Sequence, residues 1–232
     1  MNKFTIIIIL FFASLGAQGQ DSTATEQKLP GLYYLFQNNY SMAVQYNDPQ
    51  AAKTALYSMI NMDPMNDSLR FTLAYMYYEA ELYPSVILTC MDIISLNPQH
   101  AGAIEMTAIA FEQLGIRDKA LANYEKLFIV TENIQTLYKL SCLQYELERY
   151  GECEVNLDIL LANPGLDQQS VIFPISETEE KEYVMKVAVL NLSGLNKKAQ
   201  GDIDGAREEF NKALAIAPDF LLAKDNLAEL DK

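Results

Sequence analysis

The chain has 232 residues, of which 50% are hydrophobic and 21% are charged, and this composition is typical of a folded protein rather than a disordered one. Its 31 Asp and Glu residues outnumber its 17 Lys and Arg residues, which gives a net charge of −14. Because like charges repel, this balance argues against nucleic acid as a partner. With one histidine, three cysteines and no tryptophan, few residue combinations are available for catalysis or metal binding.

Residues 1–19 have the pattern of a secretory signal peptide. The apolar stretch from Phe4 to Ala17 has 14 residues, fewer than the roughly 20 that a bilayer-spanning helix needs. Small residues at Ala17 and Gly19 occupy positions −3 and −1 of a cleavage site before Gln20. We therefore expect cleavage and export to the periplasm or the medium, with no membrane attachment afterwards. The alternative is an uncleaved N-terminal helix that anchors the protein.

Four prolines follow apolar helical segments at nearly regular intervals. Pro64 and Pro98 are 34 residues apart, Pro164 follows after 66 residues, close to two such units, and Pro218 follows after a further 54. A fixed period of about 34 residues indicates a repeat protein. The last interval exceeds one period by 20 residues, which predicts an insertion before the final repeat.

The residues before each proline repeat as well. The C-terminal unit has a small residue, an aromatic residue, a second small residue and a proline, with two glycines upstream: Ala206, Phe210, Ala213, Pro218, Gly194 and Gly201. Together they resemble the tetratricopeptide repeat, a pair of antiparallel helices. Other units keep the spacing with larger side chains, such as Val86 and Cys90 before Pro98. The resemblance implies an all-α fold: an α-solenoid of about five antiparallel helix pairs with a C-terminal capping helix.

The repeat spacing divides the chain after the signal peptide. Residues 20–30 are expected to be a disordered linker, and 221–232 a capping helix. Between them, four repeats are predicted at 33–66, 67–100, 101–133 and 134–167. An insertion at 168–186 and a fifth repeat at 187–220 follow. Each helix pair can bury its apolar face only against its neighbours, so the array should stack into a superhelix with a concave groove. No segment alternates long enough to predict a sheet.

The insertion at 168–186 begins with an apolar segment, Val171–Ile175, and continues with an acidic segment, Ser176–Glu180. Acidic residues favour the first turn of a helix, so we expect the first helix of the fifth repeat to run from about 177 to 200. Two roles are open for the apolar segment: it packs over a neighbouring helix pair, or it is a strap that binds a partner.

Catalysis is not expected. Nucleophilic catalysis needs a base beside the nucleophile, and the only imidazole, His100, lies in a turn between repeats, where we expect it to be solvated. The histidine and the cysteines are too scattered for a zinc site, and no glycine-rich phosphate-binding motif is present. The sequence therefore predicts a protein that is not an enzyme and holds no cofactor or metal.

The three cysteines leave two interpretations open. Cys90, Cys142 and Cys153 all lie within helical patterns, so they are either small buried side chains, or Cys142 and Cys153 form a disulfide between adjacent helices.

In tetratricopeptide repeats the first helix of each pair lines the concave side, so the resemblance implies a binding groove. The matching residues here are mostly aromatic and acidic: Tyr34, Phe71, Tyr75, Tyr78, Glu79, Glu105, Glu112, Tyr138, Tyr145 and Glu146. The cations with which family members clamp a peptide carboxylate are missing from these places. We expect instead a basic partner segment that carries aromatic or proline residues.

The sequence thus favours a non-catalytic protein–protein interaction scaffold or adaptor of the bacterial envelope. The alternative is a membrane-anchored envelope assembly factor that keeps its N-terminal helix. The partner, the pathway and the oligomeric state are left open.

Overall fold

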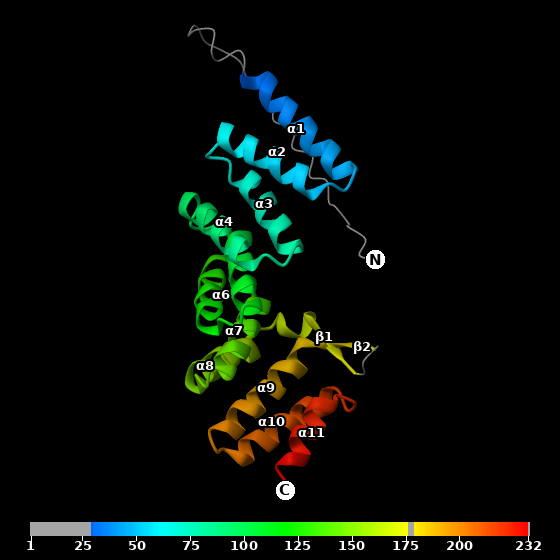
Figure 1. The fold of residues 1–232 in the computed structure, drawn as a ribbon. Helices are drawn as coiled ribbons and strands as arrows, with labels where there is room; N and C mark the ends of the chain where they lie inside the picture. The colour runs from blue at the N-terminus through cyan, green and yellow to red at the C-terminus, as the bar shows by residue number, and fades with distance from the viewer. Residues whose placement is uncertain (1–28, 176–178, 232) are drawn as a thin grey trace.

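A computed structural model describes residues 29–175 and 179–231 of the protein (Figure 1). These residues form five antiparallel helix pairs that stack in chain order into an elongated array, which confirms the predicted all-α solenoid. The first and second helices of successive pairs are α1 (Leu29–Gln45) and α2 (Pro49–Met62), α3 (Asp67–Glu79) and α4 (Tyr83–Leu96), α5 (Ala101–Gln113) and α6 (Arg117–Thr131), α7 (Ile134–Glu146) and α8 (Tyr150–Ala162), and α9 (Met185–Ala199) and α10 (Ile203–Ile216). A last helix, α11 (Leu221–Glu229), packs against the fifth pair.

The predicted signal peptide, 1–19, lies outside the described residues. So does most of the predicted linker, 20–30, although α1 begins inside that range, at Leu29. None of the described helices is both long and apolar enough to cross a lipid bilayer.

Helix ends have local causes in the sequence. The second helices α2, α4, α8 and α10 each end two residues before one of the four spaced prolines, because the residue before a proline disfavours the helical conformation. Asp48 begins α2: its carboxylate accepts hydrogen bonds from the backbone N–H groups of Gln50 and Ala51, and Pro49 occupies the first turn.

The turn inside each helix pair contains one residue with a left-handed backbone. In the third and fifth pairs it is a glycine, Gly115 (φ +71°) and Gly201 (φ +87°), which adopts this conformation without a steric penalty. In the other three pairs the place is held by Asn47, Glu81 and Glu148. The turns therefore keep one geometry even where the glycine of the repeat pattern is missing.

The helices pack as the repeat model requires. Each first helix contacts the second helix of its own pair, and from α3 onward it also contacts the second helix of the preceding pair. The largest group of buried side chains joins the third and fourth pairs and includes Ile104, Leu121, Leu137 and Leu157.

All three cysteines are free thiols. Cys90 and Cys153 are fully buried and Cys142 is half-buried. The interpretation as buried side chains is therefore correct for Cys90 and Cys153, and the alternative disulfide between Cys142 and Cys153 is not formed.

The insertion differs from its prediction. It contains a short helical turn, η1 (Leu166–Gln168), and an antiparallel hairpin of β1 (Ser170–Pro174) and β2 (Glu180–Val184), with Ser170 opposite Val184 and Pro174 opposite Glu180. The predicted helix over 177–200 is therefore wrong at its start, because α9 begins only at Met185. The expectation that no sheet forms is also wrong.

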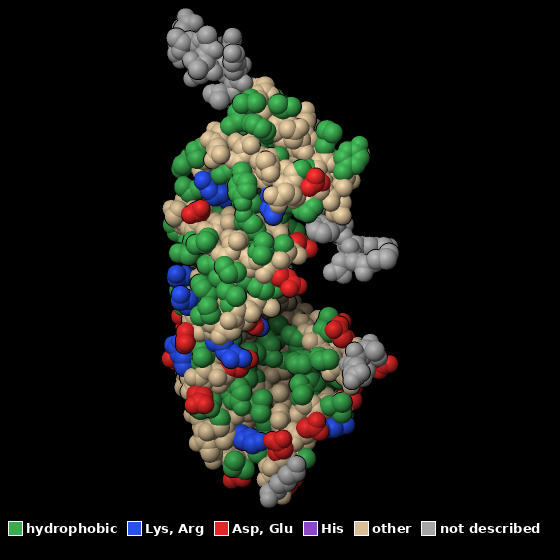
Figure 2. All heavy atoms as spheres, viewed as in Figure 1, with side chains coloured by type: hydrophobic (Ala, Val, Ile, Leu, Met, Phe, Trp, Pro, Cys, Tyr) green, Lys and Arg blue, Asp and Glu red, His purple; other side chains and the backbone are tan. Residues whose placement is uncertain are grey.

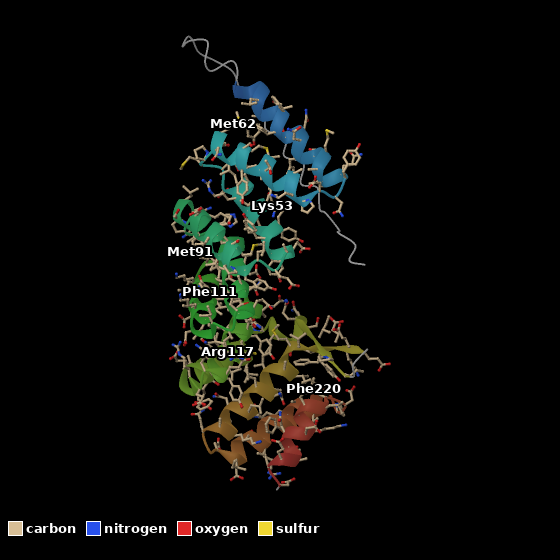
Figure 3. The ribbon with its side chains drawn as sticks, viewed as in Figure 1. Lys53, Met62, Met91, Phe111, Arg117 and Phe220 are labelled. Atoms are coloured by element: carbon tan, nitrogen blue, oxygen red, sulfur yellow. The ribbon has the colours of Figure 1, made fainter. Side chains whose placement is uncertain are left out.

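The hairpin forms because one of its faces is apolar and finds a partner far along the chain. The rings of Phe173 and Tyr183 pack against the ring of Phe220, which follows α10. Their centroids lie 5.2 Å and 4.9 Å from the Phe220 centroid. Figure 3 shows Phe220 beneath the hairpin, next to α11. The insertion thus packs onto the end of the fifth pair, as the first of its two predicted roles required.

Candidate functional site: the concave face

In Figure 1, α3 and the hairpin lie on one side of the array, whereas α4, α6 and α8 run along the opposite edge. Figure 2 shows the molecule hollowed on the hairpin side, between the middle helix pairs and the hairpin, with hydrophobic side chains gathered there. All ten residues predicted to line a groove lie on the first helices α1, α3, α5 and α7. Their surroundings divide them into solvent-facing and packed residues.

Five of the predicted residues face solvent: Tyr34, Tyr75, Glu79, Glu105 and Glu146. The Tyr75 side chain is 49% exposed on α3. Partial burial, and after it the Glu79 carboxylate one turn away, raises the pKa of the Tyr75 hydroxyl. The Glu79 carboxylate also accepts a hydrogen bond from this hydroxyl, so the two side chains are partners within α3.

Phe71 is held against the next helix pair. Its ring lies 5.0 Å from the imidazole of His100, and a Cβ atom at Gly102 would approach the Phe71 ring to 2.8 Å. The imidazole Nδ1 accepts a hydrogen bond of 3.1 Å from the backbone N–H of Ala103. His100 is thus a half-buried cap of α5, and its prediction as a solvated turn residue is wrong.

The remaining tyrosines are half-buried by contacts within the protein. Tyr78 packs edge-on against Tyr83 at 6.2 Å, and Tyr145 lies 5.9 Å from Tyr150. Tyr138 has its pKa raised by burial and, next, by Cys142. These three side chains are therefore only partly accessible to a partner.

Glu112 has two partners that the sequence did not reveal. Its carboxylate accepts a hydrogen bond of 3.1 Å from the Tyr124 hydroxyl and one of 2.6 Å from the Lys139 ammonium group. Burial, followed by the Glu112 charge, raises the pKa of Tyr124. Glu112 therefore ties α5 to α6 and α7.

Glu146 is also paired: its carboxylate lies 2.9 Å from the guanidinium Nε of Arg117, a residue labelled in Figure 3 at the start of α6. The predicted acidic lining is thus half neutralised. Within the described ranges, ion pairs are formed by Glu112 and Glu146 but not by Glu79 or Glu105.

Sequence reasoning missed Lys139 and Arg117 because they follow no repeat position. They reach carboxylates 27 and 29 residues away on neighbouring helices. No local pattern of the sequence signals these two pairs, because both depend on how neighbouring helices stack.

The concave face shows no arrangement for metal chemistry. Among the residues that the structure describes, no three His, Cys, Asp or Glu side chains converge on a point that could hold a metal ion. Burial raises the pKa of Cys142 to about 11, so this thiol is protonated and poorly nucleophilic at neutral pH.

Comparison with models of known protein families and with curated proteins finds no match. Solved structures do match. A tetratricopeptide repeat protein from Parabacteroides merdae superposes with a TM-score of 0.61 at 19% identity, over 85% of this chain and 72% of that one. MamA gives 0.60 at 15% identity, over 86% and 96% of the two chains. YrrB, described as a TPR protein with an unusual peptide-binding site, gives 0.61 at 13% identity, over 82% and 89%.

Proposed function

Because the chain has the tetratricopeptide repeat fold, we propose that it is a non-catalytic scaffold that holds a segment of another protein against its concave face. The peptide-binding site named for YrrB supports this reading of the fold. The observation that carries the proposal is the exposed Tyr75 ring with Glu79 one turn away on α3, together with the solvent-facing Glu105 of α5. Neither carboxylate forms an ion pair among the described residues.

These residues favour a particular partner chemistry. A Lys or Arg side chain gains from two carboxylates that have no cation of their own, and a flat ring or proline can stack on Tyr75. The neighbouring Glu112 and Glu146 are already paired with Lys139 and Arg117, so the fourth helix pair contributes half-buried tyrosine side chains. We therefore propose a basic segment that also carries aromatic or proline residues, bound more weakly as salt rises.

Location belongs to the same proposal. The pattern of residues 1–19 supports export, so the scaffold would act in the periplasm or outside the cell. The intact mass of native protein decides the point: an N-terminus at Gln20 supports the exported form. A full-length mass in the membrane fraction supports the anchored alternative.

A site-specific crosslinker tests the concave face. A photoreactive phenylalanine at position 75 should crosslink the partner in the native envelope, because this side chain is exposed on the first helix α3. The matched control is the same residue at position 129, where Ile129 of α6 is also well exposed. Equal crosslinking from both positions, or crosslinking from 129 alone, would contradict the proposal.

A further inference from the structure

The first helix pair differs from the rest of the protein in charge. Residues 29–62 contain one acid, Asp48, and one base, Lys53, so their net charge is zero. Residues 63–232 contain 28 acids and 14 bases, and hold the whole net charge of −14. Figure 2 shows the result: green and tan atoms cover the end of the molecule around α1, while red and blue atoms are spread over the elements below.

Helix α1 has two apolar faces. One face, with Tyr33, Phe36 and Tyr40, packs on Leu56 and Met59 of α2. The other face is exposed and follows a spacing of three and four residues, the spacing of a helix that packs against another helix. We call it the α1 seam: Leu32, Leu35, Asn39 and Met42, continued by Tyr46 directly after the end of the helix.

The α1 seam is open to solvent. Leu35, Met42 and Tyr46 are 51%, 55% and 71% exposed. Beside the seam lies an open groove of about 420 Å³, to which α2 contributes the small side chains Ala51 and Ala55.

The seam is open because, among the described elements, the main helix that packs on α1 is α2. Every later first helix of the array packs against the second helix of the preceding pair, in the order α2 with α3, α4 with α5, α6 with α7 and α8 with α9. At the other end of the array, α11 packs on α9 and α10 and carries charged side chains. A solenoid end needs such a polar cap to remain soluble, and the described residues provide none over α1.

We propose that the α1 seam is a self-association surface and that its occupant is a second copy of this chain, related by a two-fold axis. Each copy then supplies the helix that the other lacks, and Asn39 lies in the middle of the contact. A helix of 17 residues is about 25 Å long. The outer face of α1 and α2 together has a projected area on the order of 500 Å². Its accessible surface is larger because side chains protrude, and it approaches the roughly 800 Å² that each partner of a stable dimer buries.

Charge selects this occupant. Two copies that meet through any part of residues 63–232 bring like charge together, whereas the first pair is neutral on both copies. The chain's own N-terminus is a poorer occupant, because the nine residues Gln20–Lys28 that the predicted cleavage leaves before α1 are mostly polar. The inference is independent of the concave face.

Sedimentation equilibrium of the native protein, purified from its source, tests the proposal. At about 100 µM, where contacts of micromolar affinity are populated, the mass should be that of a dimer. Raising NaCl should preserve or tighten the dimer, because salt screens the repulsion between the acidic bodies. A monomeric mass at all salt concentrations would overturn the proposal and would point to the N-terminal residues or another protein as the cover. Larger species that grow with concentration would exclude a closed two-fold contact.

Two variants and one control locate the contact. Met42→Glu places a carboxylate from each copy in the seam and should weaken dimerisation at least ~100-fold. Leu88→Glu adds the same charge at a well-exposed position of α4 and should leave the dimer unchanged. Asn39→Leu should tighten the dimer about 10-fold, because a polar residue in such a seam lowers stability. Equal dissociation constants for Met42→Glu and Leu88→Glu, or no change with Asn39→Leu, would overturn the proposal.

Discussion

The first and fifth helix pairs share one repeat design and differ in how much of it is buried. Helix α9 has ten buried residues, including the polar Asn191, Ser193 and Asn196. Helix α1 has one buried residue among those described, Ala43. The cause is the number of neighbours: α9 contacts α7, α8, α10, α11 and the hairpin, whereas α1 contacts α2.

Burial in this solenoid therefore follows position in the stack rather than the local polarity of a helix. Asn191 can be buried because its side-chain oxygen accepts a hydrogen bond of 2.9 Å from Asn226 of α11. The amide of Asn196 donates a 3.1 Å hydrogen bond to the backbone carbonyl of Tyr150. Conversely, Leu35 and Met42 are exposed, and α1 is the first of the helices that the structure describes.

The largest expected effect is a loss of stability when the buried contacts of the fifth pair are removed. Phe220→Ala removes the ring on which Phe173 and Tyr183 pack, so it detaches both the hairpin and the start of α11. Loss of a fully buried phenylalanine costs about 3–5 kcal/mol, which urea unfolding would measure. Tyr34→Ala in the exposed first pair is the control, and it should change the free energy of unfolding by less than about 0.5 kcal/mol. Similar losses of unfolding free energy in both variants would contradict the difference in burial between the first and fifth helix pairs.

The second-largest expected effect tests whether the interior of the second helix pair excludes water as the interior of the fifth pair does. Burial raises the pKa of the Cys90 thiol to about 11. Because the folded-state pKa lies above the unfolded value of 9, this contribution to stability is complete below about pH 9 and is lost as pH rises toward 11. Unfolding in urea at pH 8 and pH 11 should show a loss of about 2–3 kcal/mol from this group. Cys90→Ala should reduce the alkaline loss by that amount, and an unchanged loss would mean that the thiol is hydrated in the fold.

The repeat fold could be predicted from sequence because its determinants are local and periodic. Pro64, Pro98, Pro164 and Pro218 mark helix ends that the structure reproduces. The hairpin could not be predicted in the same way, since each strand has only five residues and its stabilising contact, Phe220, lies beyond two helices. In the concave face, the common side of Phe71, Tyr75 and Tyr78 follows from helical spacing. The ion pairs of Glu112 and Glu146 depend on how neighbouring helices stack, and no local pattern encodes that.

The third prediction uses a close helix approach in the fifth pair. A Cβ atom at Gly194 of α9 would lie 2.4 Å from the ring of Phe210 in α10, and that ring is fully buried. Gly194→Ala should therefore force the two helices apart and lower the free energy of unfolding by about 1–3 kcal/mol. Gly151→Ala in α8 is the matched control, because nothing lies within 4 Å of the added carbon. Alanine favours the helix there, so this variant should be stabilised by up to about 1 kcal/mol. If both variants raise the free energy of unfolding, helix propensity and not packing determines the effect of alanine in the fifth pair.

The smallest expected effect concerns the hairpin's second attachment to the fifth pair. Lys181 of β2 makes an ion pair with Asp219, and the Tyr183 hydroxyl lies 3.4 Å from the same carboxylate. The hydrogen bond from Lys181 lowers the pKa of Asp219 and raises that of Lys181. Because the folded-state pKa of Asp219 is depressed, its contribution to stability is present above the unfolded value of 3.8 and is lost as pH falls through the folded value.

Thermal melts of Asp219→Asn across pH isolate this contribution. The melting temperature of the variant should fall below that of the parent at pH 6, by a small amount because the pair is exposed. The difference should close as pH falls below about 4, where the parent carboxylate also becomes neutral. Asp225→Asn, at an exposed position of α11, is the charge-matched control and separates this contact from the general relief of acidic repulsion. If the Asp219→Asn difference is independent of pH, or equals that of the control, the hairpin is held by its aromatic contacts alone.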